Sequence, residues 1–351
     1  MKNVSKQSAF KRVSWIDICR GIGIIFVLYG HLLSSDSLRY LIYSFHMPLF
    51  FFLSGLVFKP VLLKPIQYII IKNIKQLLLP YFGFALFTYI FAVVSNPAPD
   101  LSPGGIAWQL FGILYGSGND GMLGFNVVLW FLPCLFITKL TFALITRKVI
   151  KLKLIGFLLL MSGILGYGLS VLLPWIKLPF GFEIALTSLV FFGMGYLWKE
   201  RKFTLPYLRS YRVPLTLLAI LITLLGATTN YHIYQYQTDL RINHLGNFFL
   251  FYLSAFSGIF GCLMVSQLIT KNAFLEYLGR NSLVLFAWHN LLFVNLKEIM
   301  AAVASDDFIN SVKLFLPTFY VLTVICIIHL SRKMLLLLKN ASLTLFLTIQ
   351  Q

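Results

Sequence analysis

Residues 15–34 read WIDICRGIGIIFVLYGHLLS, an apolar stretch interrupted by the ionisable side chains Asp17, Arg20 and His31. As an α-helix, a stretch of this length extends about 30 Å, which matches the hydrocarbon core of a bilayer. Similar stretches recur along the chain, without the alternating pattern that is typical of membrane β-strands. The stretch therefore predicts the first span of an all-α, polytopic transmembrane helical bundle.

The composition of the whole chain also favours a membrane protein. Of its 351 residues, 59% are hydrophobic and only 11% are charged, and the mean hydropathy is +0.84. Soluble domains usually carry about 25% charged residues. The apolar stretches predict about ten membrane spans, at 15–34, 40–59, 74–95, 125–146, 154–173, 182–198, 212–230, 245–269, 281–299 and 314–331.

The segments around the spans carry predictions of their own. Residues 1–13 are expected to form a basic cytoplasmic N-terminus, 14–332 an integral membrane domain, and 333–351 a cytoplasmic, interfacial tail. Residues 64–73 are expected to form a short interfacial segment, and the end of the tail (340–351), too short to cross, a helix on the membrane surface. The Gly- and Pro-rich loop 95–124 is expected either to bind a polar acceptor or to cover the site.

The basic residues predict the orientation of the bundle. With the N-terminus in the cytoplasm, most of the 29 Lys and Arg residues fall in cytoplasmic segments, as the positive-inside rule requires. An even number of spans then places both termini in the cytoplasm. The net charge of +18 indicates anionic membrane lipid as a partner, and not nucleic acid.

Arg20 and His31 are the main candidates for a functional site. Eleven residues of helix amount to three turns plus about 20°, so both side chains project from one face, about 16 Å apart along the axis. Ionisable residues inside a membrane are costly and usually mark a functional path. Structural interpretations remain open for both: an ion pair with Asp17 for Arg20, and an interhelical hydrogen bond for His31.

Polar residues on the next two helices extend this site. His46 lies at a depth similar to that of His31, so the two histidines can share a proton or flank one hydroxyl, or both can be structural. Lys72 and Lys75 lie three residues apart at the cytoplasmic boundary. They can bind phosphates of a cytoplasmic donor, or they can be ordinary positive-inside lysines.

Other polar residues in the spans are candidates for substrate contacts or for structural roles: Asp17, Trp130, Glu183, Ser282 and His289. Ser282 and His289 are seven residues apart and so share a helix face. No carboxylate cluster and no Cys/His spacing predicts a metal site. The four cysteines all fall within apolar stretches, without a pairing pattern.

Several of these stretches together resemble the membrane acyltransferase-3 family. Residues 16–23 (IDICRGIG) followed by His31 are similar to the family's first helix, which carries an arginine and a histidine separated by ten residues. Residues 43–55 (YSFHMPLFFFLSG) look like its second helix, and Leu278 to His289 look like a later block. The likeness is nearest to the branch that resembles fucose 4-O-acetylases.

The chain departs from the family pattern in two places. It has Lys75 and Gln76 where many relatives carry an arginine, and the block at Trp130 lacks the acidic residue of relatives that have an attached extracytoplasmic domain. A catalytic carboxylate near Trp130 is therefore not carried over from the family.

The resemblance implies an integral membrane O-acyltransferase, usually an O-acetyltransferase, in the inner (cytoplasmic) membrane of a bacterial cell envelope. Acetyl-CoA from the cytoplasm would be the acyl donor, without a metal. The acceptor would be a carbohydrate hydroxyl of a cell-surface polysaccharide, such as exopolysaccharide or lipopolysaccharide, or of its lipid-linked precursor. Polysaccharide-assembly proteins would be further partners.

The resemblance also implies roles for the candidate residues. His31, assisted by His46, would act as general base, and Arg20, with the two lysines, would bind the donor or offset developing charge. From the residues alone, a transporter or flippase that uses Arg20, His31, His46 and Glu183 as a proton or substrate path fits nearly as well.

Overall fold

The computed structural model describes residues 13–33, 38–60, 64–95, 102–118, 121–201, 210–269 and 271–349. The predicted basic N-terminus, apart from Val13, lies outside the described residues. In chain order the helices are α1 (Ser14–Leu32), α2 (Arg39–Leu56), α3 (Ile66–Asn73), α4 (Leu79–Ser95), α5 (Pro103–Tyr115), α6 (Phe131–Lys148), α7 (Leu152–Leu172), α8 (Phe182–Glu200), α9 (Arg212–Tyr234), α10 (Phe248–Leu268), α11 (Ala273–Arg280), α12 (Ser282–Val303), α13 (Asp306–Val312) and α14 (Leu316–Ile349). Short turns of other helix types are η1 (Ile74–Leu78, a π-helix), η2 (Val127–Trp130), η3 (Pro179–Gly181) and η4 (Leu240–Ile242).

The prediction of an all-α polytopic bundle is confirmed. Among the described residues, nine helices are long and apolar enough to cross a membrane. Where the remaining span is predicted, the structure has α2, an 18-residue helix. Large apolar side chains cover the outward faces of the peripheral helices, such as Leu217, Leu221 and Leu225 on α9, as expected for a surface in contact with lipid.

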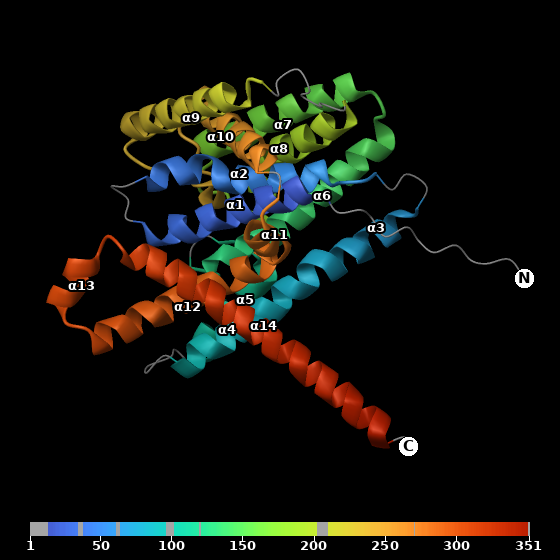
Figure 1. Cartoon of the computed structure of the whole chain (residues 1–351). Helices are drawn as coiled ribbons and strands as arrows, with labels where there is room; N and C mark the ends of the chain where they lie inside the picture. The colour runs from blue at the N-terminus through green and yellow to red at the C-terminus, as the bar shows by residue number, and fades with distance from the viewer. Residues whose placement is uncertain are drawn as a thin grey trace, which may run out of the picture.

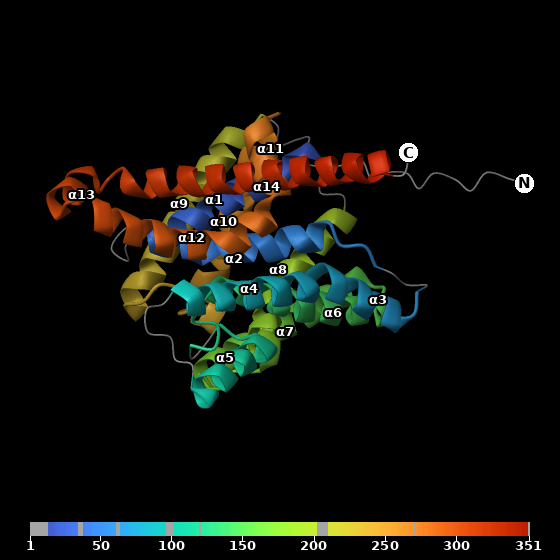
Figure 2. The same ribbon diagram turned by 90° about the horizontal axis from the view of Figure 1, so that it is seen from below.

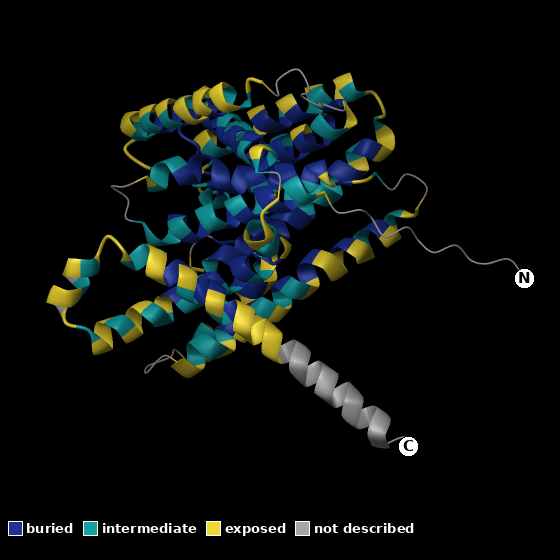
Figure 3. Cartoon of the chain, viewed as in Figure 1, coloured by how far each residue is buried: buried dark blue, intermediate teal, exposed yellow. Residues whose placement is uncertain are grey.

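The bundle is arranged around α2 (Figure 1), which contacts α1, α8, α9 and α10. Turned by 90°, the molecule shows α12 and α14 on one side of α2 and the α3–α4 rod on the other (Figure 2). Buried residues concentrate on α2, α6 and α8, whereas α9 and α14 expose much of their surface (Figure 3). Elements far apart in the chain therefore meet at the centre, where α1, α2, α6 and α12 surround the candidate site.

Two glycines allow α2 and α8 to pack backbone against backbone. A Cβ on Gly55 would overlap the carbonyl oxygen of Phe192, and a Cβ on Gly195 would overlap the carbonyl oxygen of Phe52. Each helix thus contributes one glycine to the same contact, as in the small-residue interfaces of membrane helices. This contact fixes the position of α2, which carries His46.

The segment before the third span differs from its prediction. The interfacial segment expected at 64–73 is not separate from the third span: from Ile66 on it is the start of one continuous rod, Ile66–Ser95, in which the π-helix η1 joins α3 to α4. Residues 74–78 (IKQLL) contain no glycine or proline that would break the helix. Single π-turns inside helices are rare and often lie at functional sites.

One additional helix and one longer helix also differ from the predictions. The loop 95–124 contains α5, which begins with the Ser102 hydroxyl accepting from the Gly105 N–H and ends at Gly116, with φ of 67°. The end of the tail is helical, but it continues directly from α14 rather than forming a separate helix. Residues 333–349 contain neither glycine nor proline, so nothing in the chain terminates α14 after Arg332.

Candidate active site

Three histidines from three helices meet at one end of the bundle. The rings of His31 on α1 and His289 on α12 have centroids 4.9 Å apart. His46 on α2 joins them through Tyr43, whose ring lies 4.9 Å from His46 and 6.2 Å from His31. The histidine pocket, as we call the cavity here, has a volume of about 30 Å³ and is lined by His31, Tyr43, His46, Met47, Val127, Val128, Trp130, Asp239, Leu240, Arg241 and Phe286.

Backbone contacts orient two of these imidazoles. His46 Nδ1 lies 2.8 Å from the Ile42 carbonyl oxygen, and His289 Nδ1 lies 2.8 Å from that of Phe286. A carbonyl can only accept, so each Nδ1 carries the proton and donates it, which leaves Nε2 of the neutral ring as the basic nitrogen. Nε2 of His289 is buried and has no hydrogen-bond partner among the described residues. Both rings are thus held with a proton-accepting nitrogen available.

Arg20 lines a second cavity, toward the other end of α1. This arginine pocket has a volume of about 190 Å³ and is lined by Arg20, Phe50, Ser54, Leu77, Phe131, Leu132, Leu135, Ser282, Leu283 and Phe286. Apart from the guanidinium and the two hydroxyls, its walls are apolar. One cation at the end of an apolar cavity suits a long ligand with an anionic group and a less polar arm.

A layer of aromatic rings separates the two pockets. Phe286 lines both of them. Phe131 packs edge to face on Phe286, with ring centroids 5.4 Å apart, and also contacts Phe51 at 5.0 Å. We call Phe51, Phe131 and Phe286 the aromatic layer. A reacting group that passes from one pocket to the other has to displace these rings.

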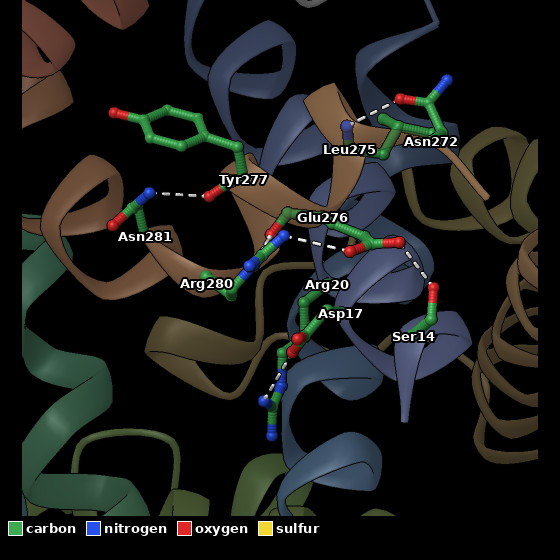
Figure 4. A network of polar contacts seen from close by, with 9 residues as sticks. All are labelled: Ser14, Asp17, Arg20, Asn272, Leu275, Glu276, Tyr277, Arg280 and Asn281. Carbon is green, nitrogen blue, oxygen red and sulfur yellow. Dashed lines mark hydrogen bonds and ion pairs between the residues drawn. The ribbon is translucent and has the colours of Figure 1, made fainter. Parts of the chain in front are cut away.

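The side chain of Arg20 pairs within its own helix (Figure 4), and α11 packs against the neighbouring backbone at Gly21. Arg20 forms an ion pair with Asp17 at 3.6 Å, as the structural interpretation predicted, and it also lines a pocket. A Cβ on Gly21 would overlap the carbonyl oxygen of Leu275, which shows how closely α11 approaches α1.

Polar contacts anchor α11 to the start of α1. Glu276 accepts from the Ser14 hydroxyl at 2.6 Å and pairs with Arg280 at 3.0 Å (Figure 4). These contacts hold the first turns of α1, and thus the backbone that carries Arg20, against α11.

The structure therefore sorts the predicted site residues into three sets. His31, His46 and Trp130 line the histidine pocket, and His289 packs against His31 behind this lining. Arg20 and Ser282 come together at the arginine pocket, with Asp17 as the ion-pair partner of Arg20. The remaining candidates are Lys72, Lys75 and Glu183, and none of these three lines either pocket.

These three residues occupy other environments. Lys72 and Lys75 are exposed on α3 and η1, next to the helix turn that contributes Leu77 to the arginine pocket. Glu183 is buried at the start of α8, where its carboxylate accepts from the Leu178 N–H at 3.0 Å.

Asp239 and Arg241 at the histidine pocket were not predicted as site residues. They lie in the connection between α9 and α10, which separates them from His31 by some 200 residues. The only signal in the sequence is that they are charged and fall on the predicted outer side, as His31 does.

The arrangement can accept a proton at one end and hold an anion at the other. The histidine pocket offers basic nitrogens to a hydroxyl that enters it. The arginine pocket offers a guanidinium, and Phe286 of the aromatic layer forms a wall that the two pockets share. Within the described ranges, no three His, Cys, Asp or Glu side chains converge as metal ligands.

Comparison with known proteins gives one match. A family model described as an acyltransferase domain, of the acyltransferase-3 type, matches residues 13–332. This range contains both pockets, the aromatic layer and α11. No curated protein and no solved structure matches the chain.

Proposed function

The chain belongs to the acyltransferase-3 family and is a multi-pass membrane acyltransferase, and from this we propose that it transfers an acetyl group from cytoplasmic acetyl-CoA to a hydroxyl of a cell-surface carbohydrate. The observation that carries the proposal is the pair of pockets along one face of α1, with Arg20 in one and His31 in the other. A transfer across a membrane needs one binding site for the donor and one for the acceptor, reached from opposite ends.

In this proposal the arginine pocket holds the donor. Acetyl-CoA supplies a thioester, whose acyl carbon is open to attack by a hydroxyl. Arg20 binds phosphate or a pantetheine carbonyl, and the apolar wall formed by Phe50, Leu77 and Leu135 accommodates the rest of the arm. Lys72 and Lys75, exposed beside this pocket, attract the nucleotide from the cytoplasm.

The histidine pocket activates the acceptor. Once the acyl group has displaced the aromatic layer and reached the acceptor, His31 takes the proton of the acceptor hydroxyl as the hydroxyl oxygen attacks the thioester carbonyl. The C–O bond forms as the C–S bond breaks. The imidazolium of His31 then gives this proton to the leaving thiolate, which restores the neutral base and releases CoA as a thiol. His46 and His289 have their Nδ1 protons committed to backbone carbonyls, and their Nε2 atoms assist in holding or relaying the proton.

The proposal is tested with the purified protein in liposomes, supplied with labelled acetyl-CoA and with surface glycan from cells that lack the protein. We expect label to appear on the glycan as alkali-labile ester, and cells with the protein to contain more glycan acetyl than cells without it. Movement of glycan or protons across the liposome membrane without labelling would instead support a transporter or flippase, and would overturn acyl transfer.

A further inference from the structure

The connection between α9 and α10 brings two charged side chains to the histidine pocket. Asp239 and Arg241 flank Leu240 in the turn η4, and all three line the same cavity as His31 and His46. The mechanism proposed above uses neither charged residue. The proposed acyl transfer gives these two charges no role, so their position beside the reacting hydroxyl needs a separate explanation.

Buried amides hold this connection in place. Asn243, with φ of 57°, donates to the Gly166 carbonyl at 3.2 Å and accepts from the Thr187 hydroxyl at 3.1 Å. Asn230 donates to the Leu245 carbonyl at 2.9 Å and accepts from the Asn247 N–H at 2.9 Å. The loop is therefore set before any ligand arrives, which reduces the entropy lost on binding.

Asp239 and Arg241 pair with each other in a geometry that leaves both able to bind more. Asp239 accepts from the Arg241 backbone N–H at 2.9 Å and from its Nη2 at 3.2 Å, while Nη1 donates to the Gly118 carbonyl at 2.6 Å. A guanidinium has five N–H donors and a carboxylate about four acceptor sites. Donors and acceptors thus remain on a pair whose charges offset each other, with side chains 29% and 14% exposed for Arg241 and Asp239.

We propose that Asp239 and Arg241 bind the acceptor, and that the acceptor is a neutral sugar. Asp239 accepts from one sugar hydroxyl and Arg241 donates to a neighbouring oxygen, which places a further hydroxyl of the same ring against His31. Donors and acceptors with offset charge match vicinal hydroxyls, which both donate and accept, better than they match an anion. The cavity of about 30 Å³ admits one or two hydroxyl-sized groups, so the sugar enters by an edge.

This inference rests on the proposed acyl transfer, and its test uses matched neutral and anionic acceptors. The neutral set contains the methyl glycosides of glucose, galactose and mannose. The anionic set contains the methyl glycosides of the corresponding uronic acids, which we call uronides and whose carboxylates are free. Transfer from labelled acetyl-CoA is measured in liposomes for the wild type and for Asp239→Asn and Arg241→Gln. The surface glycan of the preceding experiment serves as the reference acceptor.

We expect the wild type to prefer the neutral set. Both substitutions should raise the KM for neutral glycosides about tenfold, the effect of losing a hydrogen bond to a charged group, and leave the KM for acetyl-CoA unchanged. Asp239→Asn leaves the arginine charge uncompensated and should shift the preference toward uronides, whereas Arg241→Gln should shift it away from them. A purely structural role for the pair would not shift the preference in opposite directions.

The control variants are Asp307→Asn and Lys313→Gln, which change the same charges at exposed positions that line neither pocket and should behave as wild type. Unchanged acceptor KM values in both pocket variants, or a wild-type preference for uronides, would overturn the assignment. Transfer to the reference glycan but to neither set of glycosides would also overturn the assignment, although it would still support acyl transfer. Transfer to no acceptor at all would overturn the proposed function.

Discussion

His31 is the residue on which the proposed transfer depends most directly. Replacing it with alanine removes the base from the hydroxyl, but it leaves α1 packed through its buried residues, such as Ile24 and Val27. We expect His31→Ala to lower the rate of acyl transfer at least about a hundredfold, the usual contribution of a general base. The amount of protein in the membrane should stay near that of the wild type, which quantitative blotting of membranes checks.

The matched control for this variant is His232→Ala. His232 is exposed near the end of α9 and lines neither pocket, so this variant should transfer acetyl at the wild-type rate. A His31→Ala protein that kept full activity would rule out the role of His31 as the base.

Cys19 lies next to Arg20 in the chain and raises the question of a thiol acyl carrier. Its side chain is fully buried, with no exposed surface, so a thioester cannot reach it without local unfolding. We expect Cys19→Ala to retain at least about half of the wild-type transfer rate, because removing one small buried group leaves the pockets intact. A variant that is folded and abundant but inactive in the same liposome assay would support a covalent intermediate on this sulfur.

At the residue scale, sequence reasoning finds what local spacing can encode. Arg20 and His31 share a face because helical geometry alone relates them, and both line pockets in the structure. Asp239 and Arg241 reach the histidine pocket only through the connection between α9 and α10, whose path depends on Asn230 and Asn243. No periodicity of the chain describes such a path, so these residues were not predicted.

Among the elements, the spans were predictable because bilayer thickness sets their length, but the joints between elements were not. The π-turn η1 is one example, since its residues (IKQLL) are ordinary helix formers. The helix α5 is different, because its start at Ser102 and Pro103 and its end at Gly116 are recognisable signals. The sequence therefore contained the signals for this helix, and the prediction of a loop missed it because the capping residues were not considered.

The contact between α2 and α8 gives a prediction about stability. Gly55→Ala places a methyl group against the Phe192 carbonyl, so the helices have to separate, and we expect a loss of about 1–3 kcal/mol as for other overpacked interiors. Gly83→Ala on α4 is the matched control, since no atom lies within 4 Å of the added Cβ. Thermal unfolding in detergent should show a lower Tm for the first variant alone, and equal values would contradict this account of the interface.

For the whole molecule, the distribution of charge predicts which end of the bundle faces the cell exterior. Single cysteines are introduced at Asp307 and at Lys151, in a background with Cys326→Ala because Cys326 is exposed. A membrane-impermeant maleimide should label Asp307→Cys in intact cells, and Lys151→Cys only after the cells are opened. The reverse labelling pattern would place the arginine pocket toward the cell exterior and the histidine pocket toward the cytoplasm, which would contradict the proposed donor and acceptor sides.

The aromatic layer also bears on the energetics of the cell that contains the protein. A continuous column of water between the pockets would let protons and ions run down the membrane potential, which is worth about 2.3 kcal/mol per charge for each 100 mV. The two cavities are separate and share Phe286 as a wall, on which Phe131 packs. We expect this wall to block such a column, so that many copies of the protein can work in an energised membrane without acting as leaks.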